Sequence, residues 1–407
     1  MKIAVIKETR PDEARVAATP ETVKKLTALG GEVVIESGAG LNASISDDQY
    51  EEAGARMVAK AETALKGADI VLKVSRPTDS ELEHFAEGAS LISILSPHND
   101  RDNLHRYVNA GIDTYAMDLM PRITRAQSMD VLSSQSNLAG YKAVIDSTAY
   151  YGRAMPMMMT AAGTIAPAKV FVMGAGVAGL QAIATARRLG AVVSATDVRF
   201  AAKEQVESLG ATFVTVDEEA MKNAETSGGY AKEMSDDFKT RQADYVTGHI
   251  AKQDIVITTA LIPGRPAPEL VNDAMIDGMK AGSVIVDLAV EQGGNVSASL
   301  AGEIVDRNGV AIIGFNNVPG RLAADASALY ARNLLNFLTA FHDKEAQSFV
   351  FDREDEIIAG ISITRDKAIV HPQFAPEVPN VSAALADSVA SEVTLPEETA
   401  DEDTAEN

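Results

Sequence analysis

The sequence predicts an α/β protein with two domains, each built on a mostly parallel β-sheet that helices cover. Short apolar segments alternate with helical segments along most of the chain, which is typical of parallel strands joined by helices. The chain has 407 residues, more than one ordinary domain contains. A glycine-rich turn at residues 174–179, between an apolar segment and a helical one, is typical of a doubly wound sheet.

The first third of the chain carries local signals for alternating strands and helices. An apolar strand is expected at residues 2–6. Thr19 can then cap the free N–H groups of a helix, and Pro20 suits its first position. Ser46 and Gln49 form a capping-box pattern before a second, shorter helix. Further strands are expected at 32–35, 70–74, 91–95 and 114–117.

The second domain is expected at residues 134–321. A helix from about residue 137 to residue 150 should lead into it, and six strands should then alternate with helices. Proline, lysine and glycine interrupt the apolar stretch 154–186, so we expect a buried strand, turn and helix there and not a membrane span. The six strands are expected at 169–173, 191–196, 212–216, 255–259, 284–287 and 310–313.

The C-terminal part should return to the first domain. A long helix is expected over residues 322–342, followed by a hairpin within 348–372. We expect these elements to pack on the N-terminal sheet, so that the first domain consists of residues 1–133 and 322–375. Residues 376–407 contain no Lys or Arg and many acidic residues, which predicts a disordered tail that either aids solubility or tethers a partner.

Composition excludes several classes of protein. The chain has 36 Lys and Arg against 58 Asp and Glu, and this net charge of −22 would repel a nucleic-acid backbone. The absence of cysteine excludes disulfides, thiol nucleophiles and cysteine-ligated metals, and the six histidines are scattered, so we expect no metal site. The N-terminal residues lack the apolar core of a secretory signal, so a cytoplasmic protein is expected.

Three glycines follow one strand of the second domain in the spacing of a dinucleotide-binding turn. Gly174 should make the tight turn, Gly176 should let a pyrophosphate approach the backbone, and Gly179 should let helix and strand pack closely. Asp197 ends the next strand, where a carboxylate can bind the ribose hydroxyls and repel a 2′-phosphate. Arg199 could instead accept such a phosphate, but the place of Asp197 at the strand end favours NAD(H) over NADP(H).

The same geometry extends the expected NAD(H) site, because ligands of such sheets lie beyond the carboxyl ends of the strands. Val177 begins the helix after the glycine turn, and Val198 follows the strand-end aspartate. Ala260 and Leu261 follow another strand end and should lie near the nicotinamide half of the dinucleotide. Plain packing at the strand end is the alternative for these last two residues.

Residues 120–143, MPRITRAQSMDVLSSQSNLAGYKA, form a polar segment between the two domains. The segment closely resembles the NAD(H)-binding subunit or domain of proton-translocating nicotinamide nucleotide transhydrogenase, and the resemblance covers all but the acidic tail. It is most specific in RAQSMDVLSSQSNLAGY, GAGVAGLQAIATARRLGAVVSATDVR, GGYAKEM and ITTALIPGRPAP. The resemblance implies two Rossmann-like domains with NAD in the cleft between them.

Carried over residue by residue, the resemblance implies that the polar segment contacts the nicotinamide ribose and carboxamide through Arg122, Gln127, Asp130 and Ser133. Gln127 is the best candidate for a contact with the second nucleotide. Such contacts would hold the donor ring at near-attack distance. The residue types alone are equally compatible with loop capping and with packing between the domains.

Residues 217–240 are expected to form an exposed, flexible insertion between strands. In the family that the chain resembles, a mobile loop at this place closes over the bound nucleotide. The resemblance implies that Gly229 helps to make the loop mobile and that Tyr230 packs by the adenosine, so that closure excludes water. An ordinary surface loop is the alternative.

The resemblance also implies a reaction and a set of partners. NADH would reduce NADP+ by direct hydride transfer, driven by inward proton flow. NADP(H) and the proton path would lie on partner subunits. We expect a homodimer that is held on the inner face of the bacterial cytoplasmic membrane through those subunits, with no nucleic-acid partner.

Alanine dehydrogenase, which the chain resembles more distantly, is the alternative enzyme. Its chemistry needs a cation for the substrate carboxylate and a group that moves a proton. Arg15 and Lys73 match its carboxylate-binding and catalytic positions. Its histidine corresponds to Ile94, which cannot move a proton, and its aspartate to Glu291, although His98 could substitute for the histidine. A module that binds NAD without turnover is the third alternative.

Overall fold

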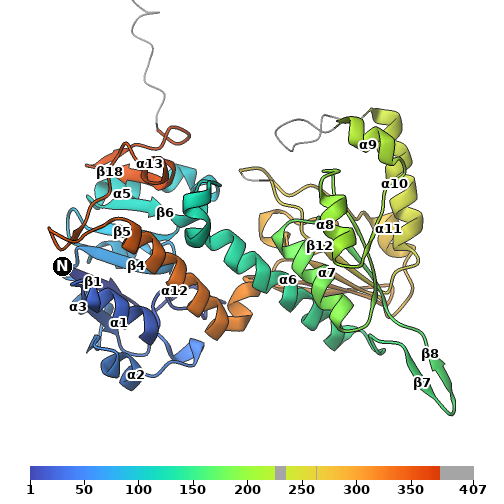
Figure 1. The fold of residues 1–407 in the computed structure, drawn as a ribbon, viewed down its shortest axis with the longest axis horizontal. Helices are drawn as coiled ribbons and strands as arrows, with labels where there is room; N and C mark the ends of the chain where they lie inside the picture. Colours follow the sequence, from blue (N-terminus) through green and yellow to red (C-terminus); the bar gives the residue numbers. More distant parts are fainter. Residues whose placement is uncertain (225–234, 263, 376–407) are drawn as a thin grey trace, which may run out of the picture.

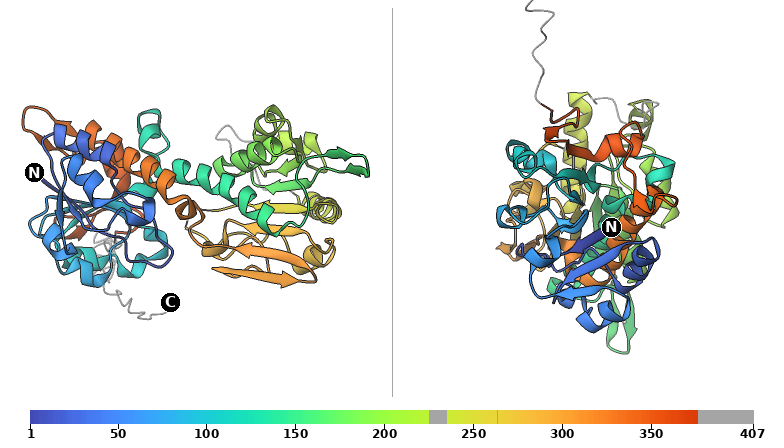
Figure 2. Two further views of the ribbon diagram at one scale, coloured as in Figure 1. Left: turned by 90° about the horizontal axis from the view of Figure 1, so that it is seen from below. Right: turned by 90° about the vertical axis from the view of Figure 1, so that its left-hand side faces the viewer.

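The computed structural model describes residues 1–224, 235–262 and 264–375. Two large β-sheets form the centres of two α/β domains that lie side by side (Figure 1). The long helices α6 (Val131–Tyr150) and α12 (Ala323–Ala340) pack against each other and run between the domains, as the view from below in Figure 2 shows. The predicted α/β class with mostly parallel sheets is confirmed.

The first sheet has eight strands in the order β19-β18-β6-β5-β4-β1-β2-β3. Strands β1 to β6 are parallel, whereas β18 is antiparallel to β6 and forms a hairpin with β19. The C-terminal part of the chain therefore extends the N-terminal sheet. The strands are β1 (Lys2–Val5), β2 (Glu32–Glu36), β3 (Arg56–Val58), β4 (Ile70–Ser75), β5 (Ser90–Ile94), β6 (Asp113–Ala116), β18 (Ser362–Arg365) and β19 (Ala368–Ile369). The helices around this sheet are α1 (Pro20–Ala28), α2 (Asp47–Glu52), α3 (Ala61–Leu65), α4 (Asp79–Leu82), α5 (His105–Asn109) and α13 (Glu356–Ile361).

The two predicted helix caps of this domain are confirmed. The hydroxyl of Thr19 accepts the N–H of Thr22 at the start of α1, and Ser46 accepts the N–H of Gln49 at the start of α2. These bonds satisfy N–H groups that have no partner inside the helix. The central strands are buried on both faces, as a parallel sheet covered by helices requires.

The second sheet has seven strands in the order β11-β10-β9-β12-β13-β15-β14. The strand order reverses between β9 and β12, so the carboxyl ends of these two strands border the crevice where such sheets bind ligands. The antiparallel strand β14 was not predicted. The strands are β9 (Lys169–Met173), β10 (Val192–Thr196), β11 (Thr212–Phe213), β12 (Ile255–Thr258), β13 (Val284–Asp287), β14 (Glu303–Arg307) and β15 (Val310–Gly314). The helices are α7 (Val177–Arg188), α8 (Ala202–Ser208), α9 (Glu218–Ala224), α10 (Asp236–Ile250) and α11 (Asp273–Asp277).

Two predictions about the start of the second domain were wrong. Helix α6 begins at Val131, well before residue 137, because Asp130 caps it. Residues 158–165 form a hairpin of β7 (Met158–Thr160) and β8 (Gly163–Ile165) that projects from the domain and is exposed (Figure 1). The buried strand that the apolar composition predicted for this stretch therefore begins only at β9.

Two further segments also differ from the predictions. The apolar residues at 356–361 form α13, which Asp355 caps through the N–H of Ile357, so only residues 362–369 form the hairpin. The insertion expected at 217–240 begins with α9 and ends in α10, while residues 225–234 lie outside the described part of the chain. Within the described residues, no helix is long and apolar enough to cross a membrane.

Candidate dinucleotide-binding site

The turn between β9 and α7 has a backbone that requires glycine at two positions and leaves open space at a third. Gly174 has a φ of +104°, and a Cβ on Gly179 would lie only 1.8 Å from the carbonyl oxygen of Gly174. A Cβ on Gly176 would meet no described atom within 4 Å. Gly176 is also the N-cap of α7 and offers no capping side chain. The free N–H groups at the start of α7 thus face open space, which suits an anionic pyrophosphate.

Asp197 closes the turn on its other side. One of its carboxylate oxygens accepts the N–H of Ala175 at 2.7 Å, and the other accepts the N–H and Nε–H of Arg199 at 2.8 and 2.9 Å. Burial alone would raise the pKa of Asp197, but the hydrogen bonds from Arg199 and Ala175 hold it below its ordinary value. The carboxylate therefore stays ionised, and Arg199 is bound to it instead of being held ready for a 2′-phosphate.

Apolar side chains are exposed around the glycine turn, where a dinucleotide would place its flat rings. Val198, directly after Asp197, is 78% exposed, and Val177 at the start of α7 is 41% exposed. Leu261, beyond the end of β12, is 47% exposed. Exposed apolar surface next to a few convergent polar groups is typical of a small-molecule site.

The backbone at Ala260 is held by two residues that sequence reasoning missed. The side-chain amide of Asn295 accepts the N–H of Ala260 and donates to its carbonyl oxygen, both at 2.9 Å. The carboxylate of Asp287 in turn accepts the N–H of Asn295 at 2.9 Å. Asp287 is fully buried, and burial raises its pKa although hydrogen bonds counteract the effect. The signal was a carboxylate at a strand end followed by the polar segment EQGGN.

The polar segment between the domains contains the short 3-10 helix η5 (Thr124–Met129) and the start of α6. Asp130 and Ser133 form the cap of α6, because the carboxylate of Asp130 accepts the N–H of Ser133 at 2.9 Å and its hydroxyl at 2.5 Å. Arg122 and Gln127 are exposed. The structure therefore divides the four predicted contacts into a capping pair and two side chains that face solvent.

Helix α6 connects this polar segment to the glycine turn. A Cβ on Gly140 would lie 2.0 Å from the carbonyl oxygen of Ala178, so α6 and α7 cross in direct backbone contact. Asp130 and Gly140 are ten residues apart along one helix, which is about 15 Å. The structure thus relates the two predicted parts of the site through one rigid helix and does not bring them into direct contact. Gly229 and Tyr230 lie outside the described residues and stay a prediction.

The two cations that match alanine dehydrogenase are both bound by carboxylates of this chain. The Nε and Nη2 atoms of Arg15 donate to Glu13 at 2.8 and 2.7 Å, and its Nη1 donates to Gln135 at 2.8 Å. The ammonium group of Lys73 lies 3.2 Å from Glu8 and 3.3 Å from Glu81. All of these side chains are buried.

The pKa values of two of these carboxylates move in opposite directions. Burial raises the pKa of Glu8, and the nearby Lys73 offsets this only in part. Burial also opposes ionisation of Glu13, but its hydrogen bonds and ion pair with Arg15 lower its pKa below the ordinary value. Arg15 and Glu13 thus form a stable buried ion pair.

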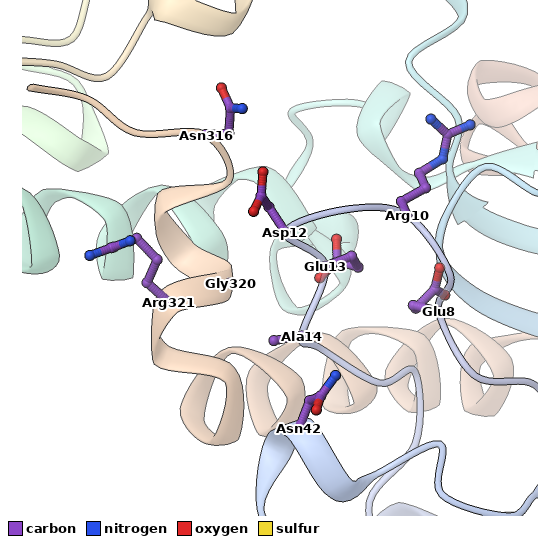
Figure 3. Close-up of a pocket in the computed structure, with 9 residues that line it drawn as sticks. All are labelled: Glu8, Arg10, Asp12, Glu13, Ala14, Asn42, Asn316, Gly320 and Arg321. Atoms are coloured by element: carbon purple, nitrogen blue, oxygen red, sulfur yellow. The ribbon is translucent and has the colours of Figure 1, made fainter. Parts of the chain in front are cut away.

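Next to these pairs, a cavity of about 350 Å³ opens between the loop 8–14 and the segment 316–321 (Figure 3). Two arginines line it, but Arg10 donates to the carbonyl oxygen of Arg76 and Arg321 pairs with Asp146. The cavity is lined by Glu8, Arg10, Asp12, Glu13, Ala14, Asn42, Asn316, Gly320 and Arg321. The three carboxylates in this set would disfavour the carboxylate of an amino acid.

The other positions considered for alanine oxidation are also accounted for. Ile94 ends β5, and Glu291 is exposed and accepts the N–H of Asn317 at 3.0 Å. His98 lies on the face toward the second domain, since a Cβ on Gly264 would be 2.9 Å from its Nδ1, and its ring packs on Phe374 at 4.9 Å. His98 thus belongs to a contact between the domains.

Comparisons with known proteins agree with this architecture. The chain matches the family models "Alanine dehydrogenase/PNT, N-terminal domain" over residues 4–139 and "Alanine dehydrogenase/PNT, C-terminal domain" over residues 143–372. A relative from Rhodospirillum rubrum is the first of the separate chains that make up its NAD(P) transhydrogenase subunit alpha. The two chains are 58% identical over 377 residues, which covers 91% of this chain and 98% of that protein.

A solved structure and a more distant relative complete the comparison. The crystal structure of a transhydrogenase from Sinorhizobium meliloti matches with a TM-score of 0.83 and 54% identity, over 91% of this chain and 100% of that chain. Alanine dehydrogenase 1 of Staphylococcus aureus is 28% identical over 377 residues, which covers 89% of this chain and 93% of that protein. The two resemblances noted in the sequence are confirmed, with the transhydrogenase subunit the more similar of the two.

Proposed function

The chain belongs to the alanine dehydrogenase/PNT family, and from this premise we propose that it is the NAD(H)-binding subunit of a proton-translocating NAD(P) transhydrogenase. NADH bound to this chain gives hydride to NADP+ bound to a partner subunit, and membrane-embedded partners couple the transfer to proton translocation. The observation that carries the proposal is that Arg15 and Lys73 are both neutralised by buried carboxylates.

The proposed reaction needs no acid or base from this chain. A hydride, with its two electrons, leaves C4 of the dihydronicotinamide ring of NADH and forms a bond to C4 of the nicotinamide ring of NADP+. NADH becomes NAD+ and NADP+ becomes NADPH, and no proton enters or leaves either ring. The cofactors supply the chemistry, so the protein contributes binding, orientation and exclusion of water.

The described residues fit these tasks. The N–H groups at Gly176 face open space where the pyrophosphate would bind, and Asp197 is ionised at the place of the ribose diol. The Asn295 amide fixes the backbone at Ala260, where the nicotinamide half would lie. Gln127 is exposed and would reach the second nucleotide. We propose that Tyr230 closes over the adenosine, and that two copies of the chain associate.

Alanine oxidation is less well supported by the same geometry. It needs a free cation for the substrate carboxylate and a group that takes a proton from the amine or the hydroxyl intermediate. Arg15 is occupied by Glu13 and Gln135, and a hydrocarbon side chain, Ile94, stands where alanine dehydrogenase has a histidine. A single rotation of one side chain would not free both Arg15 and Lys73.

The decisive experiment is reconstitution. The purified chain is added to membranes that contain the partner subunits but have been stripped of this one, with NADH and NADP+, and the NADPH formed is separated from NADH by chromatography. We expect NADPH formation to depend on the added chain, and we expect no NADH from L-alanine and NAD+ in a parallel reaction. The variant Gln127→Asn should slow NADPH formation without weakening NADH binding.

A matched variant makes this last result specific. Gln205 is another exposed glutamine of the second domain, on α8, so Gln205→Asn makes the same chemical change away from the proposed site. It should leave NADPH formation unchanged. Steady alanine turnover without NADPH formation would replace the proposal by alanine dehydrogenase. NADH binding with neither reaction would identify a module that binds NAD without turnover.

A further inference from the structure

The segment that carries Gln127 is held on both sides of this residue by the C-terminal part of the chain. On one side, the guanidinium group of Arg125 makes two hydrogen bonds of 2.8 Å with the carboxylate of Asp355, the residue that caps α13. On the other side, the carbonyl oxygen of Ser128 accepts two hydrogen bonds from α12. Gln127 thus lies between two anchors and is itself exposed.

The anchor on α12 consists of two asparagines one helical turn apart. The amide nitrogens of Asn333 and Asn336 donate to the carbonyl oxygen of Ser128 at 2.8 and 3.0 Å. The amide oxygen of Asn333 accepts the hydroxyl of Ser134 in α6 at 2.8 Å. Asn333 is 8% exposed, so both ends of a buried amide are used. One side chain of α12 therefore holds the polar segment and the start of α6 together.

We infer that Asn333 and Asn336 are positioning residues for hydride transfer, which act by holding the backbone at Ser128 so that Gln127 presents its amide to the second nucleotide. The inference rests on the proposed function of the chain. Two properties of the segment require such an anchor. Its 3-10 turns have poor internal hydrogen-bond geometry, and Gln127 makes no side-chain hydrogen bond within the described residues that would fix it.

Because α12 runs between the domains, the anchor also connects the segment to the second domain. The start of α12 follows η7 (Val318–Leu322), where Arg321 pairs with Asp146 of α6. A movement of the two domains that shifts α12 along α6 would therefore shift the carbonyl oxygen of Ser128 and the neighbouring Gln127 with it.

The test uses Asn336→Ala, because Asn336 is only partly buried and its loss removes one of the two hydrogen bonds without opening the core. The complete chain with stripped partner membranes should form NADPH about 10- to 100-fold more slowly, as expected for misplacement of a reacting group by about an ångström. NADH affinity, measured by titration of the chain alone, should stay within about twofold. The control Asn103→Ala also loses one amide hydrogen bond, of 2.9 Å to Asp100, and should change neither quantity.

Two further measurements separate positioning from general stability. In a Gln127→Asn background, Asn336→Ala should have no further effect on the rate, because both changes remove the same contact. Amide hydrogen exchange of residues 124–130 should become faster in Asn336→Ala, with the rest of α12 unchanged. Additive rate losses, or unchanged exchange, would overturn the inference. The exchange result needs no turnover, so it tests the anchor even if the transhydrogenase proposal fails.

Discussion

Gly176→Ala should separate nucleotide binding from folding. Gly176 has φ −76° and ψ −167°, an extended conformation that alanine adopts easily, and its new Cβ would meet no described atom within 4 Å. Nothing in the folded chain therefore opposes the substitution. Because alanine also lowers the conformational entropy of the unfolded chain, the variant should be as stable as the wild type or more stable by up to about 1 kcal/mol.

The cost of this substitution should fall on the dinucleotide. The added methyl group occupies the space through which a pyrophosphate would reach the N–H groups of α7. Forcing a methyl group into a tight contact costs about 1–3 kcal/mol. Since 1.4 kcal/mol is a factor of ten, the Kd for NADH should rise by roughly 5- to 150-fold.

Gly179→Ala is the control, because it adds the same methyl group three residues later with the opposite consequence. Its Cβ would lie 1.8 Å from the carbonyl oxygen of Gly174, so the backbone of the turn must move. We expect stability to fall by about 1–3 kcal/mol or more, at roughly 2–4 °C in Tm per kcal/mol for a domain of this size. Thermal unfolding without nucleotide and NADH titration measure both effects. A stable Gly176→Ala protein that binds NADH like the wild type would refute this account of the turn.

Three other perturbations test the packing and the buried charges. Lys73→Met should destabilise the protein by about 3–5 kcal/mol at pH 8. The loss should be smaller at pH 5, because burial raises the pKa of Glu8 and its protonated form is the one favoured in the folded state at low pH; equal losses in urea titrations at both pH values would contradict this. His249→Asn should flatten the fall in stability below about pH 6.5, because burial lowers the pKa of His249 and only the unfolded chain then binds its proton; an unchanged pH profile of Tm would contradict it. Gly140→Ala places a Cβ 2.0 Å from the carbonyl oxygen of Ala178 and should lower Tm by several degrees; a variant with the wild-type Tm would show that α6 and α7 can separate freely.

The fold was predictable where the signal is local. A threonine before a proline, or a serine three residues before a glutamine, determines a helix start through hydrogen bonds that span three residues, and both caps are present. The glycine turn is similar, because the positive φ at Gly174 and the contact at Gly179 are properties of six consecutive residues. Parallel strands were identifiable because burial on both faces makes them continuously apolar.

The errors in the fold have a common physical origin. Apolar composition reports that a segment avoids water in some context, but it does not report the secondary structure or the partner. The residues at 356–361 are a short apolar run that suits a strand or a helix equally, and the cap at Asp355 selects the helix. The hairpin β7–β8 is apolar and yet Met159 is 78% exposed, because its two strands pair with each other and not with the sheet.

The site was predictable in its ligand-facing residues and not in the residues that hold them. The glycine turn and Asp197 follow from a motif that spans a single β–α–β unit. Asn295 is 35 residues from Ala260 in the chain, and Asn333 is 205 residues from Ser128. No spacing rule relates such pairs, because their contact depends on strand order in one case and on the crossing of two helices in the other.

Arg15 and Lys73 show why a match at one position does not transfer an activity. Each residue type is what a carboxylate-binding site needs, and each is in the matching place of the chain. What a cation can do depends on whether its charge is already compensated. Glu13 is two residues from Arg15 and visible in the sequence as a possible partner, but Gln135 is 120 residues away and completes its hydrogen bonds only in the folded chain. Since freeing either cation would leave a buried carboxylate without its partner, at a cost of several kcal/mol, the closed pairs are a stable end state of this cleft. A substrate carboxylate would have to compete with Glu13 and Glu8 for charges that the chain already neutralises, whereas hydride transfer between two nicotinamide rings requires neither cation.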